Sequence, residues 1–313
     1  MTPLLDVRDL GVAFGSSHAV DGVSFTVAAG ETLGLVGESG CAKSTTALAL
    51  MQLLHGATLR GSALFGGCDL LTLGEAAMRR VRGGEIAMIF QDPVTALHPL
   101  IRVGEQVAEA LRAHRDISSA EARARTLDLF RKVGIAAPEQ RLRAYPHELS
   151  GGMCQRVMIA AAIACGPRLL LADEPTTALD VTVQAQILEL LQSVSREAGM
   201  AVILITHDLG VVAGMADRVA VMYAGRIVET ADTTTLFAAP SHPYTRGLLG
   251  ALPQLDRGWD DDLPTIPGSV ETAATAAGCR FAPRCPLAAE ICVEAPPLSP
   301  IAEGHAAACW KAR

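Results

Sequence analysis

The chain has 313 residues, half of them apolar, and a formal net charge of −7. This length suits one large domain with a smaller one, or two domains. No apolar run reaches the roughly 18–20 residues of a membrane span, and the start MTPLLDVRDL lacks the basic region of a secretory signal, so we expect a cytosolic protein. The absence of a basic run argues against general nucleic-acid binding.

Residues 4–28 alternate apolar and polar positions in short runs broken by glycines, which predicts antiparallel strands and turns. Phe14 lies in one of these turns. An exposed aromatic ring there can stack on a nucleotide base, but packing on an edge strand fits the pattern equally well.

Residues 33–48, LGLVGESGCAKSTTAL, place a glycine-rich turn between an apolar strand and a helix that begins near Lys43. Gly37 and Gly40 allow a tight turn whose backbone N–H groups converge on phosphate oxygens. Lys43 can then reach the β- and γ-phosphates, and the Ser44 hydroxyl can bind Mg²⁺. By itself, the stretch also fits a simple glycine-rich turn without a ligand.

Position 42 departs from the phosphate-loop pattern G-x-x-x-x-G-K-[ST], because alanine stands where the second glycine is expected. If this residue requires a positive φ angle, alanine costs about 1–2 kcal/mol there. Its methyl group would also crowd the β-phosphate. Because of Ala42, the sequence also allows a protein that binds or hydrolyses nucleotide poorly.

After the loop, we expect the helix to run to about Leu54 and a strand to return in GSALFGG. Residues 86–90 are continuously apolar, as in buried parallel strands, and Gln91 follows them. Polar groups at the carboxyl ends of such strands bind ligands in open α/β sheets.

Residues 103–165 are mainly helical in pattern, with Ser119 as an expected N-cap and Gly134 as an expected helix stop. Within this stretch, Ser150 and the two glycines after it open another helix. Their hydroxyl and N–H groups would make an anion site, although such a sequence is usually only a cap.

Residues 169–172 predict a further buried strand that ends in Asp173 and Glu174. Two adjacent carboxylates are costly in a core, but they suit a Mg²⁺ ligand followed by a residue that polarises water. A helix with one apolar face and a strand at 201–205 come next, and His207 follows them. A lone histidine there is more often structural than catalytic, but this is the fourth strand to end in polar residues.

Residues 218–229 then predict a closing hairpin. Alternating strands and helices indicate an α/β fold with a mainly parallel sheet. Polar residues at the strand ends favour nucleotide hydrolysis as its chemistry.

Over residues 4–255 the sequence resembles the ATPase subunit of an ABC (ATP-binding cassette) transporter. The motifs occur in family order: GESGCAKS, Gln91 of the Q-loop, the signature LSGGMCQR, LLLADE with Glu174, ALD at 178–180 as the D-loop and the switch residue His207. The resemblance implies a P-loop NTPase with a RecA-like parallel sheet in residues 1–255, an N-terminal antiparallel β-subdomain and a helical signature subdomain at about 92–165. Residues 256–313 would form a small, irregular, cysteine-rich extension.

The resemblance also implies a composite ATP site shared by two ATPase domains. ATP would be held by Phe14, Gly37, Glu38, Ser39, Gly40, Cys41, Ala42, Lys43, Ser44 and Thr45. Mg²⁺ would be bound by Ser44, Gln91 and Asp173, and catalysis would depend on Glu174 as the base, His207, Gln91 and Lys43. The ATP of the partner subunit would be reached by Ser150, Gly151, Gly152 and Gln155.

The segments IFQDPVTALHPL, YPHELSGG and SHPYTRGLL are similar to the oligopeptide/dipeptide branch of importers, which includes nickel systems. Departures are Ala42, Cys154 and His98. We expect ATP hydrolysis that energises peptide import, with nickel, another metal chelate or an opine-like compound as alternative solutes. The further alternatives are a catalytically weak partner ATPase and a soluble ABC ATPase of DNA repair or translation.

The implied partners are a second ATPase subunit, identical or different, two transmembrane permease subunits and an extracytoplasmic solute-binding protein, with no nucleic acid. Because the chain has no span of its own, the resemblance implies a peripheral protein on the cytoplasmic face of the inner membrane.

Eight cysteines in a reducing compartment do not suggest a disulfide framework. Those at 41, 68, 154 and 165 are expected to be small buried hydrophobic residues. The last four, Cys279, Cys285, Cys292 and Cys309, predict four-coordinate metal binding by a segment with little core of its own. Zinc, an iron–sulfur cluster and free thiols remain open on spacing alone, and the resemblance favours [4Fe–4S].

Overall fold

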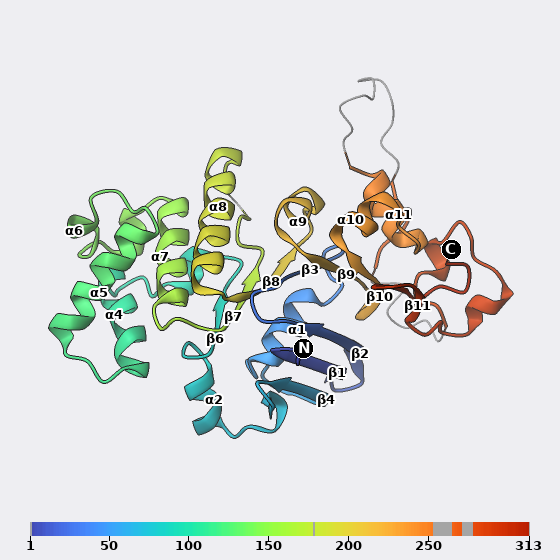
Figure 1. Ribbon diagram of the computed structural model, residues 1–313, viewed down its shortest axis with the longest axis horizontal. Helices are drawn as coiled ribbons and strands as arrows, with labels where there is room; N and C mark the ends of the chain where they lie inside the picture. Colours follow the sequence, from blue (N-terminus) through green and yellow to red (C-terminus); the bar gives the residue numbers. More distant parts are fainter. Residues whose placement is uncertain (1, 178, 253–264, 271–277, 313) are drawn as a thin grey trace. The chain divides into compact units, whose positions relative to one another are not determined.

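The computed structural model describes residues 2–177, 179–252, 265–270 and 278–312. The chain divides into two compact units. The first unit contains residues 1–27, 32–71 and 206–313, and the second contains residues 28–31 and 72–205. Figure 1 shows the elements of both units along the chain.

The first unit contains an antiparallel sheet in the order β2-β1-β4-β5. Its strands are β1 (Leu5–Phe14), β2 (Ser17–Val27), β4 (Ala57–Phe65) and β5 (Cys68–Asp69). The inward positions of β1 and β2, among them Leu5 and Val27, are fully buried, whereas polar residues alternate with them. The expected antiparallel strands in residues 4–28 are confirmed.

A second set of strands in this unit leads to the phosphate loop. Strand β3 (Thr32–Val36) runs parallel to β9 (Arg218–Tyr223), which forms the predicted hairpin with β10 (Arg226–Asp232). The helices of this unit are α1 (Lys43–Leu50), α9 (Leu209–Met215), α10 (Thr233–Ala238) and α11 (Pro243–Gly250).

The C-terminal extension is less irregular than predicted. Strand β12 (His305–Ala307) pairs antiparallel with β10, and β11 (Ser299–Ala302) pairs with β12. Two short 3₁₀ turns, η4 (Ala282–Arg284) and η5 (Glu290–Val293), precede them. The extension thus continues the sheet of the first unit, because the open edge of β10 supplies the backbone partners that β12 needs.

The second unit has parallel strands β6 (Ile86–Ile89), β7 (Leu169–Asp173) and β8 (Ala201–Thr206), the last residue of which opens the next segment of the first unit. Every residue of these strands is buried, in keeping with their continuous apolar sequences. The helices are α2 (Glu75–Val81), α3 (Pro93–Ala96), α4 (Val103–His114), α5 (Ser119–Lys132), α6 (Pro138–Arg141), α7 (Gly151–Ile163) and α8 (Val181–Ala198), with the 3₁₀ turn η2 at Pro146–Glu148. The α/β class with parallel strands is confirmed.

Two helix boundaries and the exposure of one cysteine differ from the expectations. Helix α1 ends at Leu50 rather than Leu54, because Gln52 adopts a left-handed conformation with a φ of 49°. The N-cap of α5 is Ser118, not Ser119, and its hydroxyl accepts a hydrogen bond from the N–H of Glu121. Cys68 is exposed rather than buried.

Two sequence-based expectations fall outside the described residues. The predicted D-loop begins at residue 178, and the predicted domain boundary at 255/256 lies within 253–264. The domain limits therefore stay predictions.

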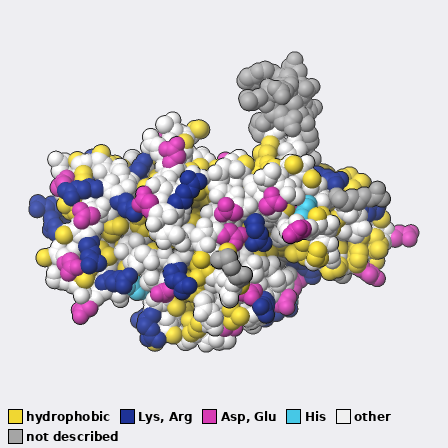
Figure 2. Space-filling model, in the orientation of Figure 1, with side chains coloured by type: hydrophobic (Ala, Val, Ile, Leu, Met, Phe, Trp, Pro, Cys, Tyr) yellow, Lys and Arg dark blue, Asp and Glu magenta, His cyan; other side chains and the backbone are white. Residues whose placement is uncertain are grey.

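Side chains on the C-terminal extension leave an apolar surface. Figure 2 shows hydrophobic side chains gathered over this part of the chain. The large hydrophobic residues exposed there are Leu287, Ile291, Val293, Leu298, Ile301 and Trp310. In the parts of the chain that the structure describes, no helix has the length and apolar character needed to cross a membrane.

Candidate functional site

The phosphate loop joins the end of β3 to the start of α1, as the sequence predicts. Gly37 has a φ of 148° and Gly40 a φ of 84°. A Cβ atom on Gly37 would lie 2.1 Å from the carbonyl oxygen of Met222, so only glycine fits this approach to β9. The amino group of Lys43 donates to the carbonyl oxygens of Gly37 and Glu38, at 2.8 and 3.0 Å. The loop thus curls around the end of the Lys43 side chain.

Ala42 is in the left-handed region, with φ 73° and ψ 26°, where it precedes the first turn of α1. Residue 42 therefore has the positive φ angle for which glycine is the favoured residue. An L-residue in this conformation costs about 1–2 kcal/mol relative to its ordinary backbone geometry. The loop thus joins β3 to α1 with this strain in it.

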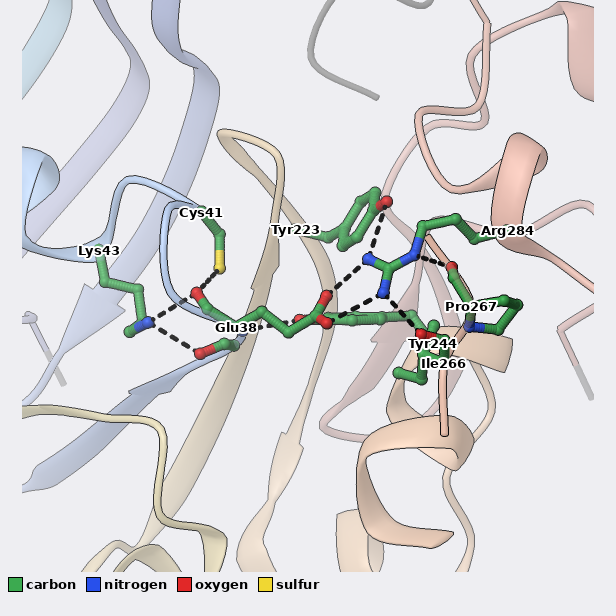
Figure 3. Close-up of polar contacts among 9 residues, drawn as sticks. Glu38, Cys41, Lys43, Tyr223, Tyr244, Ile266, Pro267 and Arg284 are labelled. Atoms are coloured by element: carbon green, nitrogen blue, oxygen red, sulfur yellow. Dashed lines mark hydrogen bonds and ion pairs between the residues drawn. The ribbon is translucent and has the colours of Figure 1, made fainter. Parts of the chain in front are cut away.

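Glu38 is held in the loop by contacts that the sequence did not indicate (Figure 3). Its backbone N–H donates to the hydroxyl of Tyr244 at 2.8 Å, and its carboxylate forms a two-pronged ion pair with Arg284 at 2.7 and 3.0 Å. The hydrogen bond to Glu38 raises the pKa of Arg284 further above its ordinary value. No local pattern signals a partner 246 residues away.

The remaining residues assigned to this site within the first unit lie near chain turns. Phe14 ends β1 and is 40% exposed, so its ring is available to a ligand. His207 follows β8 and is exposed, and Asp208 caps α9 after it. Burial raises the pKa of the Cys41 thiol to about 11. Thr45 and Ser44 lie in the first turn of α1.

The second unit gathers the other predicted groups at one edge of its parallel strands. Ile89 pairs with Ala172, and Asp173 pairs with Ile205, so Gln91 and Asp173 both follow or end strands at this edge. Asp173 is 4% exposed. Glu174 has a φ of 49°, and its carboxylate accepts a hydrogen bond from the hydroxyl of Thr177 at 2.8 Å. A strained backbone at a proposed base is a recurrent feature of catalytic sites.

The signature segment opens α7, as predicted. The hydroxyl of Ser150 accepts a hydrogen bond from the N–H of Met153, and Gly151 and Gly152 form the first helical turn. Gln155 is 2% exposed and donates to the carbonyl oxygen of Pro175 at 2.6 Å. This contact ties the helix to the residues just after Glu174. Contact of the signature with a partner's ATP stays a prediction, as does the assembly of the groups of both units into one site.

Neighbouring cysteines raise the pKa of Cys279 and Cys285, but the four C-terminal cysteines do not form a metal site among the described residues. Burial raises the pKa of Cys279, and the neighbouring Cys292 and Cys285 raise it further. Burial also raises the pKa of Cys285, and the neighbouring Cys309 and Cys292 raise it further. Among the described residues, no three histidine, cysteine, aspartate or glutamate side chains are grouped so that they could hold a metal ion. The arrangement therefore does not support the predicted metal centre.

Two family models match parts of this chain. Residues 20–177 match the ABC transporter family, and residues 228–292 match the C-terminal region of oligopeptide/dipeptide transporters. The chain is 55% identical to the "Probable peptide ABC transporter ATP-binding protein y4tR" of Sinorhizobium fredii, over 98% of this chain and 95% of the relative. It is 51% identical to the oligopeptide transport ATP-binding protein OppD of Escherichia coli, over 98% and 93% of the two chains.

Among solved structures, the chain is similar to the dimeric bacterial ABC transporter cassette MJ0796. The TM-score is 0.66 at 28% identity, over 73% of this chain and 98% of that one. The dimeric post-hydrolysis form of the same cassette, bound to ADP and Pi, gives the same TM-score at 27% identity, over 73% and 98% of the two chains. The chain therefore belongs to the ABC transporter family, as one of its ATPase subunits.

Proposed function

We propose that this ATPase subunit energises the import of di- and oligopeptides. The observation that carries the proposal is the phosphate loop wrapped around Lys43, in a chain whose residues 228–292 match the oligopeptide/dipeptide transporter C-terminal region. Relatives at 51–55% identity are named as peptide or oligopeptide transport proteins. Peptide is therefore the solute class that the comparisons favour over nickel or another metal chelate.

Each group has a role that follows from its chemistry. The loop N–H groups and the N-terminus of α1 would cradle the phosphates, with Lys43 adding positive charge. Ser44, Gln91 and Asp173 would hold Mg²⁺, which neutralises phosphate charge when bound; hydroxyl, amide and carboxylate oxygens are suitable ligands for it. Glu174 would orient or deprotonate the attacking water, and His207 would contact the γ-phosphate.

The assembly would contain a second ATPase subunit, two permease subunits and an extracytoplasmic binding protein, with this chain on the cytoplasmic face of the membrane. The membership of the ABC transporter family supports partners of these kinds. Ser150 and Gly152 at the start of α7 would then reach the ATP held by the second ATPase subunit, as hydroxyl and N–H donors at a helix N-terminus suit a γ-phosphate.

The test is transport in vesicles that contain the complete complex. We expect ATP-dependent uptake of labelled di- and oligopeptides, and loss of ATP hydrolysis and uptake on Glu174→Gln. Saturable uptake of a nickel chelate with no peptide uptake would overturn the choice of solute. To test this subunit alone, the equivalent glutamate of the second ATPase subunit is replaced first.

A catalytically weak partner ATPase remains the second candidate, because Ala42 is held in a left-handed conformation. With the second subunit inactivated, a normal rate of hydrolysis that Glu174→Gln abolishes would exclude this candidate. A low rate that Ala42→Gly restores would establish it.

A [4Fe–4S] cluster or zinc on Cys279, Cys285, Cys292 and Cys309 is kept as a separate proposal. Its support is the presence of four cysteines in the C-terminal segment, of which Cys279 and Cys285 have a pKa raised in part by neighbouring thiols; against it, no group of three possible ligands is found among the described residues. Iron, zinc and acid-labile sulfide are measured on anaerobically purified protein and on Cys285→Ser. About four irons and four sulfides per chain, lost in the variant, would support a cluster. One zinc per chain would support zinc instead. If neither metal is found, the four cysteines are free thiols.

A further inference from the structure

We propose that Arg284, together with Tyr244, is a positioning residue for the ATP site: it neutralises Glu38 and holds the phosphate loop in its binding conformation. The proposal rests on the proposed role of the loop in binding ATP. Figure 3 shows Arg284 on the side of Glu38 opposite Lys43.

The negative charge of Glu38 needs a partner before the loop can bind a phosphate chain. Glu38 puts a carboxylate into a loop that receives a polyphosphate, where an uncompensated negative charge would repel the ligand. Arg284 binds both carboxylate oxygens, through Nη1 to Oε2 at 2.7 Å and Nη2 to Oε1 at 3.0 Å. A two-pronged pair of this kind fixes orientation as well as charge, so the carboxylate is neutralised and directed toward Arg284.

Arg284 is itself held rigidly. Its side chain is 3% exposed. Nε donates to the carbonyl oxygen of Pro267 at 2.6 Å, Nη2 also donates to that of Ile266 at 3.2 Å, and the guanidinium lies 5.7 Å from the ring centre of Tyr223. A planar guanidinium held by this many partners has one orientation, and lysine could not reproduce it.

Tyr244 holds the backbone of the same loop residue, Glu38. Its ring is fully buried and lies against Tyr223 and Phe281, with ring centres 4.6 and 5.4 Å away. Its hydroxyl accepts the 2.8 Å hydrogen bond from the N–H of Glu38. Glu38 is thus fixed at its N–H by Tyr244, at its carbonyl by Lys43 and at its carboxylate by Arg284.

The consequence is preorganisation of the loop by a segment some 200 residues away in sequence. If the binding-competent loop is populated only in part, the apparent Kd for ATP rises by the inverse of that fraction. Loss of Arg284 would act twice, through a less populated loop and through the exposed charge of Glu38.

The experiment measures the Kd for ATP·Mg²⁺ by calorimetry on the full chain carrying Glu174→Gln to prevent turnover. We expect Arg284→Met to raise the Kd on the order of tenfold. Adding Glu38→Gln to Arg284→Met should recover part of the loss, because the repelling charge is gone. Because removing an unpaired carboxylate can also restore stability, the free energy of unfolding of the same variants is measured beside the Kd.

The matched control is Arg280→Met. Arg280 lies in the same segment, is 9% exposed and donates to Asp21 at 2.8 Å and to the carbonyl oxygen of Ala224, and neither of these hydrogen bonds goes to the phosphate loop. The Kd of the Arg280→Met variant for ATP·Mg²⁺ should stay within about twofold of the Kd of the parent protein. If Arg284→Met fails to fold, Tyr244→Phe, which removes only the hydroxyl that accepts from Glu38, should still raise the Kd severalfold.

The outcomes separate the two proposals. A parent protein that binds no ATP would overturn the proposed function and this inference with it. A parent that binds ATP, with an unchanged Kd in folded Arg284→Met, would overturn the inference alone. Equal losses in Arg284→Met with and without Glu38→Gln would also overturn it, since neutralisation would then play no part.

Discussion

The imidazole Nε2 of His305 on β12 lies 2.8 Å from the carboxylate of Glu229 on β10, and both side chains are buried. The same carboxylate accepts hydrogen bonds from the N–H groups of Ser241 and His242, at 2.6 and 2.9 Å. The Nδ1 atom of His242 then accepts from the N–H of Tyr244 and caps α11. The SHPYT segment is thus anchored to the sheet edge that carries the C-terminal extension.

His242 should make the stability of the protein fall on acidification. Burial lowers the pKa of His242 from 6.5 to about 4. Because the unfolded chain then takes up a proton that the folded chain excludes, stability is full above pH 6.5 and is lost as the pH falls toward 4. We expect a loss of about 2 kcal/mol between pH 7.5 and pH 5 from this group.

The measurement is urea unfolding at several pH values, with His242→Asn as the control. Asparagine keeps a cap acceptor but does not titrate. The difference between the two pH profiles isolates His242 from the many carboxylates. Parallel profiles would contradict the prediction.

Ala42→Gly should stabilise the protein by about 1 kcal/mol, because glycine adopts the left-handed conformation of residue 42 without the Cβ strain. The matched control is Ala124→Gly in the exposed face of α5, where the same change should destabilise by about 1 kcal/mol. Denaturant unfolding measures both. The same sign for the two variants would contradict the strain at position 42.

Gly37→Ala should distort the phosphate loop and abolish ATP binding. The added Cβ would lie 2.1 Å from a backbone oxygen, of Met222, and 2.8 Å from the sulfur of Cys41. Relief requires movement of the loop away from β9, at a cost of roughly 1–3 kcal/mol. The Kd for ATP is measured by calorimetry, and the free energy of unfolding is measured on the same variant.

Gly15→Ala is the control for this steric effect. Gly15 also has a positive φ, of 59°, but no atom lies within 4 Å of its added Cβ. We expect a small loss of stability and an unchanged Kd for ATP. A Gly37→Ala variant that binds ATP with the wild-type Kd would show that the loop does not need this close approach.

Cys41 should resist alkylation in the folded protein, although it lies in the phosphate loop. Its side chain is fully buried, and its pKa of about 11 against an ordinary 9.0 leaves about a hundredfold less thiolate. Cys68 is exposed and should react first. Peptide mapping after iodoacetamide treatment at pH 8 measures both rates, and denaturant should make them equal. Equal rates in the folded protein would refute the buried position of Cys41.

The sequence by itself determined the local chemistry. The glycine spacing and Lys43 predicted the turn and helix start, since φ freedom and helix initiation are short-range properties. The continuous apolar runs before Gln91 and Asp173 predicted buried parallel strands for the same reason. Ser118 was missed only because either of two adjacent serines can cap a helix.

Only the tertiary structure decided how the C-terminal segment meets the loop. Arg284 reads from the sequence as an ordinary basic residue between two cysteines, and β12 as part of an irregular tail. An ion pair such as that of Arg284 with Glu38, or a strand added at the edge of β10, depends on groups that folding brings together from far apart in the chain. No sequence motif predicts this ion pair or this strand pairing, because three-dimensional packing, and not distance along the sequence, decides which groups meet.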